Sequence, residues 1–207
     1  GLSFKLHVPE DLGPERKCSL LVALHGMGST GEEFATWFEA LTFENFVVCA
    51  PKSTGVAWNK PDVEKVKEIV RHLLRSLPID EGRLHATGFS NGGAHLPFLV
   101  LDPKLPFATV CWMGSGYAGG KVPARARKEM AVLALAGERD PAIGAARKTP
   151  DLLEKKVRYA EFRSQPDLAH EIPDELMPYY HYWLGVMEGR CEAGKDLSFD
   201  WAFDIEL

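Results

Sequence analysis

The segment Gly88-Phe89-Ser90-Asn91-Gly92 carries residue types that could do covalent chemistry. It has the pattern G-x-S-x-G, and it lies between a β-like apolar run over 83–87 and a helical pattern over 92–101. In this setting the small residues on both sides of the serine let strand and helix pack closely, so that the hydroxyl projects above the sheet as a nucleophile. The positive end of the helix also points toward a developing negative charge. The motif predicts Ser90 as the nucleophile of an acyl transfer; without that setting, it would be a glycine-rich turn with an inert serine.

A serine hydroxyl is a weak nucleophile and needs a base that an acid holds in the right tautomer. Candidates follow in the chain order serine, carboxylate, histidine. Asp140 lies in a loop after the apolar run 130–136, and His170 lies in a loop after the run 157–162. Both loops follow strand ends, the edge where open α/β sheets bind ligands. We predict that His170 is the base and Asp140 the acid, with Glu138 in the same loop as the alternative acid.

The other histidines fit the role of the base less well. His25 precedes the serine in the chain and is interpreted as a loop-shaping residue. His95 falls on the far side of the helix after Ser90, where it is a packing residue. The rest lie in expected strands or helices, where a solvated or hydrogen-bonded histidine is the default: His7, His72, His85 and His181.

A second element of the expected site is the turn His25-Gly26-Met27-Gly28, which follows the apolar run 19–24. A turn of this kind supplies one backbone N–H of an oxyanion hole, and the residue after the nucleophile supplies the other. We therefore expect the N–H groups of Met27 and Asn91 to bind the oxyanion, with an ordinary glycine turn as the alternative. Trp58 and Met113, together with the Met27 side chain, are candidate walls of a substrate pocket, and they are equally interpretable as core or rim residues.

Short apolar runs alternate with amphipathic segments along the chain, which is typical of βα units around a mostly parallel sheet. We expect an α/β fold of about seven strands with helices on both faces. The expected strands are 3–8, 19–24, 46–50, 83–87, 108–113, 130–136 and 157–162. The expected helices are 32–40, 62–76, 92–101, 145–155 and 174–187, the last with Pro178 near its start.

The pattern favours one domain over residues 1–189, followed by a polar, acidic tail over 190–207. The tail carries Phe199, Trp201 and Phe203, and we expect it to pack on the domain or to link it to an absent partner. The connection over 51–62 leaves little room for an inserted lid. We therefore expect an open, shallow site.

Composition narrows the partners of this 207-residue chain. The net charge is −5 and no run of five basic residues occurs, which argues against nucleic acid. Neither a leader nor an apolar stretch of membrane-spanning length is present, which favours a cytoplasmic location unless a leader has been removed. No metal or other cofactor is indicated, because the four cysteines lack metal-ligand spacing, and we expect them to be reduced thiols: Cys18, Cys49, Cys111 and Cys191.

With these motifs the chain resembles the α/β-hydrolase superfamily, and within it the phospholipase/carboxylesterase group that includes acyl-protein thioesterases. The resemblance runs through the segments 20–28, 88–93 and 170–175, and His170-Glu171-Ile172-Pro173 is similar to the ending of that group. In the group these segments supply the oxyanion donors, the nucleophile and the base. The chain departs from it at Asn91 and Ala169, where glutamine and glycine are usual, and Asn91 resembles the polyhydroxybutyrate-depolymerase and feruloyl-esterase-like branch.

Together, the motifs and the resemblance predict a serine hydrolase that cleaves carboxylic esters or thioesters of small molecules through an acyl-enzyme on Ser90. The alternative is a non-catalytic binding domain of the same fold within a longer polypeptide, since a fold by itself does not determine function. A peptidase would need an added domain to bind a peptide chain, and the sequence contains none. The oligomeric state stays open.

Overall fold

The computed structural model describes residues 1–190, apart from the side chains of residues 42–44 and 127. The tail that we expect over 190–207 lies outside the described residues, except for Arg190. The strands are β1 (Phe4–His7), β2 (Cys18–Leu24), β3 (Phe46–Pro51), β4 (Ile79–Phe89), β5 (Phe107–Met113), β6 (Ala131–Gly137) and β7 (Tyr159–Gln165). The α-helices are α1 (Gly31–Ala35), α2 (Lys60–Ser76), α3 (Asn91–Val100), α4 (Ala126–Glu129), α5 (Ile143–Leu153) and α6 (Met177–Met187), and 3-10 segments cover Thr36–Glu44 and Asp174–Leu176.

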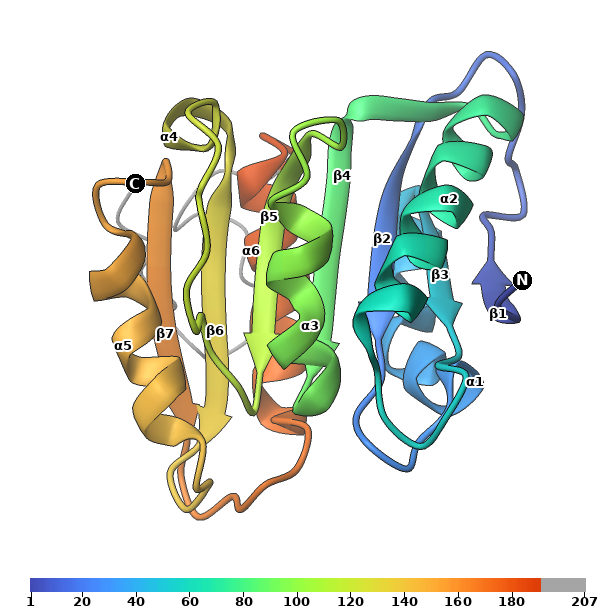
Figure 1. The fold of residues 1–207 in the computed structure, drawn as a ribbon. Helices are drawn as coiled ribbons and strands as arrows, with labels where there is room; N and C mark the ends of the chain where they lie inside the picture. The colour runs from blue at the N-terminus through green and yellow to red at the C-terminus, as the bar shows by residue number, and fades with distance from the viewer. Residues whose placement is uncertain (191–207) are drawn as a thin grey trace.

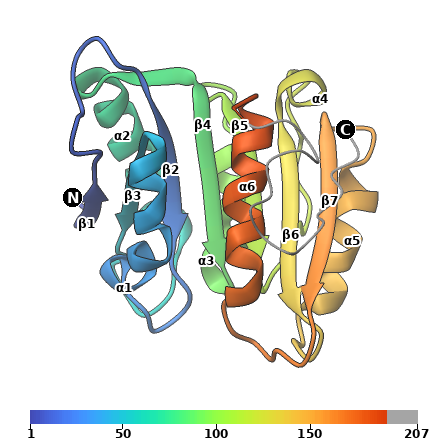
Figure 2. The same cartoon turned by 180° about the vertical axis from the view of Figure 1, so that it is seen from behind.

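The strands form one sheet in the order β1-β3-β2-β4-β5-β6-β7. Only β1 runs antiparallel to its neighbour, so the predicted mostly parallel sheet is confirmed. Helices α2, α3 and α5 cover one face (Figure 1), and α1 and α6 cover the other (Figure 2). The carboxyl ends of the parallel strands point to the lower edge in Figure 1. Every loop that carries an expected site residue lies at that edge.

Each face of the sheet has its own apolar core, because continuous apolar strands are covered on both sides. The core under α2 and α3 includes Val66, Val70 and Leu99, and the core under α6 includes Tyr180 and Trp183. Cys18, Cys49 and Cys111 are free thiols, as expected, and all three are buried; burial raises the pKa of the Cys49 thiol to about 12. Cys191 lies outside the described residues.

Several boundaries differ from the expected ones for local reasons. β4 starts at Ile79, because Ile79 pairs with Cys18 of β2 although the residues after it are polar. α6 starts at Met177, where Pro178 occupies the first turn, and residues 174–176 form a 3-10 turn instead of α-helix. The expected helix over 32–40 is a short α1 followed by 3-10 geometry. Helix α4 was not expected from the sequence.

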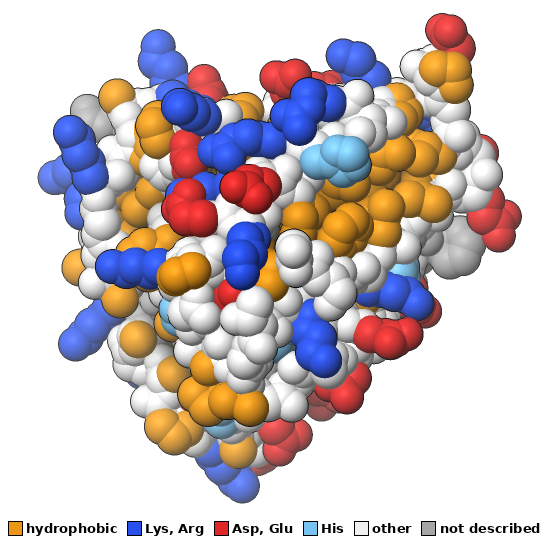
Figure 3. All heavy atoms as spheres, turned by 45° about the vertical axis from the view of Figure 1, so that its right-hand side comes forward, with side chains coloured by type: hydrophobic (Ala, Val, Ile, Leu, Met, Phe, Trp, Pro, Cys, Tyr) orange, Lys and Arg blue, Asp and Glu red, His pale blue; other side chains and the backbone are white. Residues whose placement is uncertain are grey.

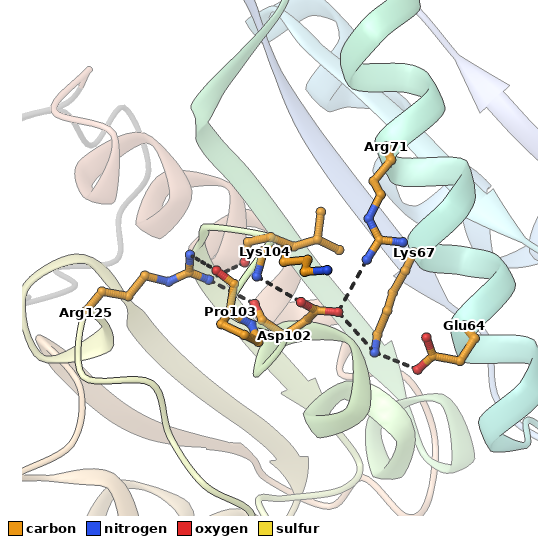
Figure 4. Close-up of polar contacts among 8 residues, drawn as sticks. Glu64, Lys67, Arg71, Asp102, Pro103, Lys104 and Arg125 are labelled. Carbon is orange, nitrogen blue, oxygen red and sulfur yellow. Dashed lines mark hydrogen bonds and ion pairs between the residues drawn. The ribbon is translucent and has the colours of Figure 1, made fainter.

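Ion pairs around Asp102, just after α3, tie α2 to α3 (Figure 4). Asp102 Oδ2 lies 3.3 Å from Lys67 Nζ and 3.5 Å from Arg71 Nη2, and Asp102 Oδ1 accepts the N–H of Lys104 at 2.8 Å. Arg125 Nη1 donates to the carbonyl oxygen of Pro103 at 3.1 Å. The ion pairs of Asp102 with Lys67 and Arg71 hold the end of the helix that follows the G-x-S-x-G turn against α2.

The face toward α2 and the N-terminal segment carries a continuous area of apolar side chains beside scattered charges (Figure 3). Phe4 and Val8 are among the exposed large apolar residues of the N-terminal segment.

No helix within residues 1–190 combines the length and the hydropathy needed to cross a bilayer.

Candidate active site

Ser90 lies at the turn between β4 and α3 with a backbone conformation that few residues adopt, φ 51° and ψ −116°. A non-glycine residue at positive φ is uncommon and marks strain that the surroundings must hold. The surroundings do so here: the N–H of Ser90 donates to the carbonyl oxygen of Met113 at 2.8 Å, and a Cβ at Gly92 would collide with the carbonyl oxygen of Leu24. The glycine after the motif serine is therefore required by the close approach of β2 to α3.

His170 connects Ser90 to Asp140. Its Nε2 lies 2.7 Å from Ser90 Oγ, and its Nδ1 lies 2.9 Å from both carboxylate oxygens of Asp140. The Asp140 side chain is fully buried, whereas 41% of the His170 side chain is exposed. This arrangement puts the nucleophile and base in contact with solvent and keeps the acid away from it.

The loops after β6 and β7 hold this geometry through backbone hydrogen bonds. The N–H of Arg139 donates to the carbonyl oxygen of Leu168 at 2.9 Å, which joins the two loops just beside Asp140 and His170. The N–H of Ala142 donates to Asp140 Oδ1 at 2.7 Å and fixes the carboxylate. Buried Gln165 donates to Asp174 Oδ1 at 2.9 Å, so it fixes the far end of the loop that carries His170.

The structure brings together Ser90, Asp140 and His170 and leaves out the alternative acid. Glu138 is exposed, and its Oε1 accepts from the hydroxyl of Ser164 at 3.3 Å. His95 donates from Nδ1 to the carbonyl oxygen of Asn91 at 2.9 Å, on the helix itself. The remaining histidines lie in strands and helices as expected: His7, His72, His85 and His181.

The expected oxyanion donors lie on segments that contact each other. Asn91 is the first residue of α3, and an N–H at this position has no acceptor within the helix. A Cβ at Gly92 would also collide with the carbonyl oxygen of His25, so the start of α3 lies against the turn that contains Met27. The turn that contains Met27 therefore packs against the G-x-S-x-G turn, and the assignment of the Met27 and Asn91 N–H groups as oxyanion donors stays a prediction.

The three expected pocket walls differ in exposure. Met27 is 64% exposed. Its neighbour Gly28 donates a hydrogen bond to the carbonyl oxygen of Val56, and the residue Val56 is 73% exposed. Trp58 is 4% exposed. Met113 is fully buried in the core under α6, because it is the last residue of a central strand, and its side chain forms no part of an open wall.

Phe89 is a residue of the site that sequence reasoning missed. Its ring stacks on the imidazole of His170 with 5.1 Å between the ring centroids, and a Cβ at Gly26 would lie 2.8 Å from this ring. The only signal in the sequence was its position just before the serine, which says nothing of the direction of its side chain.

Among residues 1–190, no group of three or more His, Cys, Asp or Glu side chains is arranged to hold a metal ion.

The curated relatives of this chain include two feruloyl esterases. No protein-family model matches the chain. Feruloyl esterase C of Emericella nidulans is 26% identical over 158 residues, and a probable feruloyl esterase C of Aspergillus niger is 25% identical over 158 residues. Each match covers 69% of this chain and 56% of the relative, so the chain spans little more than half the length of these curated relatives.

Solved structures resemble most of the described chain. A thermostable esterase superposes with a TM-score of 0.69 at 23% identity, covering 88% of this chain and 58% of that chain. A carboxylesterase of Bacillus cereus has a TM-score of 0.69 at 16% identity, covering 90% and 94% of the two chains. Acyl-protein thioesterase 2 of Zea mays has a TM-score of 0.69 at 16% identity, covering 89% and 98%. The sheet order and these likenesses identify the fold of this chain as the α/β-hydrolase fold that the sequence predicts.

Proposed function

We propose that this chain is a serine hydrolase that cleaves carboxylic esters or thioesters of small molecules, and that its domain over residues 1–189 carries the chemistry. The observation that carries the proposal is the continuous line of hydrogen bonds from Ser90 Oγ through His170 to Asp140. A serine, an imidazole and a buried carboxylate in this order can activate a hydroxyl group near neutral pH. The names of the curated relatives and of the solved neighbours also support ester hydrolysis.

In the acylation step His170 Nε2 takes the proton of Ser90 Oγ while the oxygen attacks the carbonyl carbon of the substrate. A C–O bond forms, and the carbonyl electron pair moves to the oxygen, where the N–H groups of Met27 and Asn91 stabilise it. His170 then gives its proton to the leaving alcohol or thiol as the bond to the acyl carbon breaks. Asp140 accepts the Nδ1–H of His170 throughout, which stabilises the imidazolium form.

In the deacylation step water takes the place of the alcohol. His170 takes a proton from the water, the oxygen adds to the acyl carbon, and the same two N–H groups stabilise the second oxyanion. The bond to Ser90 Oγ then breaks, and the proton returns to the serine. The partial exposure of His170 fits this step, because water reaches the base directly.

The substrate class follows from the exposed edge. Met27 and Val56 present apolar side chains beside the proposed oxyanion turn, and this favours an apolar or aromatic acyl group. Feruloyl esters are therefore suitable first substrates, in keeping with the names of the curated relatives. The non-catalytic alternative is not favoured, because a binding domain has no need for a strained serine that is hydrogen-bonded to a partly exposed histidine.

The experiment is labelling of the protein with a fluorophosphonate probe, together with hydrolysis of methyl ferulate and of p-nitrophenyl esters from acetate to decanoate. Ser90→Ala is expected to abolish labelling and to lower kcat by several powers of ten, because the three residues act as a unit. Ser76→Ala is the matched control, since Ser76 is exposed at the end of α2, and it is expected to retain both. Full ester hydrolysis by folded Ser90→Ala would contradict the proposal.

A further inference from the structure

The connection between β3 and α2 lies against both segments that carry the proposed oxyanion donors. Trp58 in this connection forms two hydrogen bonds to them. Its backbone N–H donates to Asn91 Oδ1 at 2.7 Å, and its indole Nε1–H donates to the carbonyl oxygen of His25 at 2.9 Å. A single residue therefore joins the start of α3 to the turn after β2.

The same connection contacts the turn at two further places. The N–H of Ser53 donates to His25 Nε2 at 3.1 Å, and the N–H of Gly28 donates to the carbonyl oxygen of Val56 at 2.7 Å. Because Nε2 accepts, the neutral imidazole donates from Nδ1 to the carbonyl oxygen of Gly26 at 2.7 Å. Burial lowers the pKa of His25 and thereby keeps this neutral form. Hydrogen bonds thus fix residues on both sides of Met27.

The connection itself is fixed to α2. The Asp62 carboxylate, which is 1% exposed, accepts the N–H of Thr54 at 3.1 Å and the Thr54 hydroxyl at 2.9 Å. Asn59 caps the helix by accepting the N–H of Asp62 at 2.9 Å. Since α2 packs on the core, the connection is anchored at one end on a rigid element and at the other on the site.

Stabilisation of an oxyanion depends on donors that are already in place before the charge develops. A misplacement of about 1 Å costs on the order of 100-fold in rate. We propose that Trp58 is a positioning residue: its two hydrogen bonds hold the Met27 turn and the start of α3 at the separation that lets both backbone N–H groups bind one oxyanion. This inference rests on the proposed function, and it replaces the role of pocket wall that the sequence suggested for Trp58.

Trp58→Phe tests the indole hydrogen bond, because it keeps an aromatic ring and removes the N–H. We expect kcat for p-nitrophenyl acetate to fall about 10- to 100-fold with KM changed less than twofold, as for an interaction made only in the transition state. A trifluoromethyl ketone accepts the serine oxygen at its carbonyl carbon and so creates an oxyanion on the enzyme. Its affinity is expected to fall by the same factor as kcat, a readout that a merely structural role would leave unchanged.

Trp183→Phe is the matched control, because Trp183 is a fully buried tryptophan of α6 in the other core. It is expected to lower the melting temperature about as much as Trp58→Phe and to leave kcat and inhibitor affinity within twofold of wild type. Asn91→Ala is the second variant, because its side chain is half-buried and its loss removes the acceptor of the Trp58 N–H without removing core volume. It is expected to reproduce the loss of kcat and of inhibitor affinity.

Two outcomes would overturn the inference. In the first, Trp58→Phe or Asn91→Ala folds and keeps kcat and inhibitor affinity within twofold of wild type. In the second, Trp183→Phe lowers the melting temperature as much as Trp58→Phe and also loses as much kcat and inhibitor affinity. Both are distinct from failure of the proposed function, which would appear as esterase activity in Ser90→Ala.

Discussion

The ring of Phe89 stacks on the imidazole of His170, with the centroids 5.1 Å apart and the planes 30° apart. This contact packs an aromatic ring against one face of the imidazole of the proposed base. Phe89→Leu is expected to lower kcat by about 2- to 10-fold, since an aromatic pair contributes about 0.5–1.5 kcal/mol beyond its buried area. Phe98→Leu is the control, because Phe98 is exposed on α3, and it is expected to leave kcat unchanged. Equal rates for both variants would remove the orienting role of Phe89.

The two carboxylates of the loop after β6 are distinguished by a pair of amide variants. Asp140→Asn is expected to lower kcat by about 10³- to 10⁴-fold, because an amide cannot stabilise the imidazolium and can favour the wrong tautomer of His170. Glu138→Gln is expected to leave kcat within twofold, since Glu138 is exposed and contacts Ser164. Steady-state kinetics with p-nitrophenyl acetate measures both, and the reverse ranking would assign the acid to Glu138.

Gly92 is expected to tolerate no side chain. A Cβ at this position would collide with the carbonyl oxygens of Leu24 and His25, so Gly92→Ala is expected to lower the free energy of unfolding by about 1–3 kcal/mol and also to lower kcat. Gly144→Ala in α5 is the control, because open space surrounds Gly144 and the helix gains about 0.5–1 kcal/mol from alanine. Urea denaturation measures both, and a neutral Gly92→Ala would contradict the close packing of β2 on α3.

Glu188 at the end of α6 makes the stability of the fold depend on acid pH. Its carboxylate is buried and lies 2.7 Å from His85 Nε2, with Ser19 and Arg190 as further donors. Burial raises its pKa, but the hydrogen bonds from His85 and Ser19 and the attraction to His85 and Arg190 together lower it to about 2. The unfolded chain, in which glutamate has its ordinary pKa near 4.5, therefore binds the proton first as the pH falls.

Glu188 is accordingly expected to contribute on the order of 3 kcal/mol to the free energy of unfolding above pH 4.5. This contribution is expected to be lost as the pH drops from 4.5 toward 2. Glu188→Gln is expected to be less stable at pH 7 by about 3 kcal/mol and to lose this part of the pH dependence. Glu64→Gln is the control, since Glu64 is a mostly exposed partner of Lys67. Parallel pH curves for wild type and Glu188→Gln would contradict this role of Glu188.

The exposed Met27 side chain is expected to contribute to substrate choice. Met27→Ser removes apolar surface beside the proposed site and leaves the backbone N–H in place. KM for p-nitrophenyl octanoate is expected to rise about 3- to 10-fold while KM for the acetate stays unchanged, because the loss of a few apolar contacts costs roughly 1 kcal/mol. Val8→Ser is the control on the N-terminal segment, where Val8 is 43% exposed. An equal rise for both esters would argue against an acyl-binding role.

The alternation of strands and helices, and the three loops that bear Ser90, Asp140 and His170, could be predicted from the amino-acid sequence. Local patterns suffice for this, because a continuous apolar run between turn residues specifies a buried strand and a G-x-S-x-G turn needs only its two neighbouring elements. The parallel sheet then brings the ends of β4, β6 and β7 to one edge, so that residues 30 and 80 positions apart meet at His170.

Which neighbours each side chain contacts became visible in the folded chain alone. Asp140 and Glu138 are two residues apart in one loop, and the path of that loop alone turns Asp140 inward to His170. Trp58 and Asn91 are 33 residues apart, and His85 and Glu188 are 103 apart. No local pattern encodes such pairs. They form because β2, α3 and α6 pack closely on the sheet and because buried polar groups need hydrogen-bond partners.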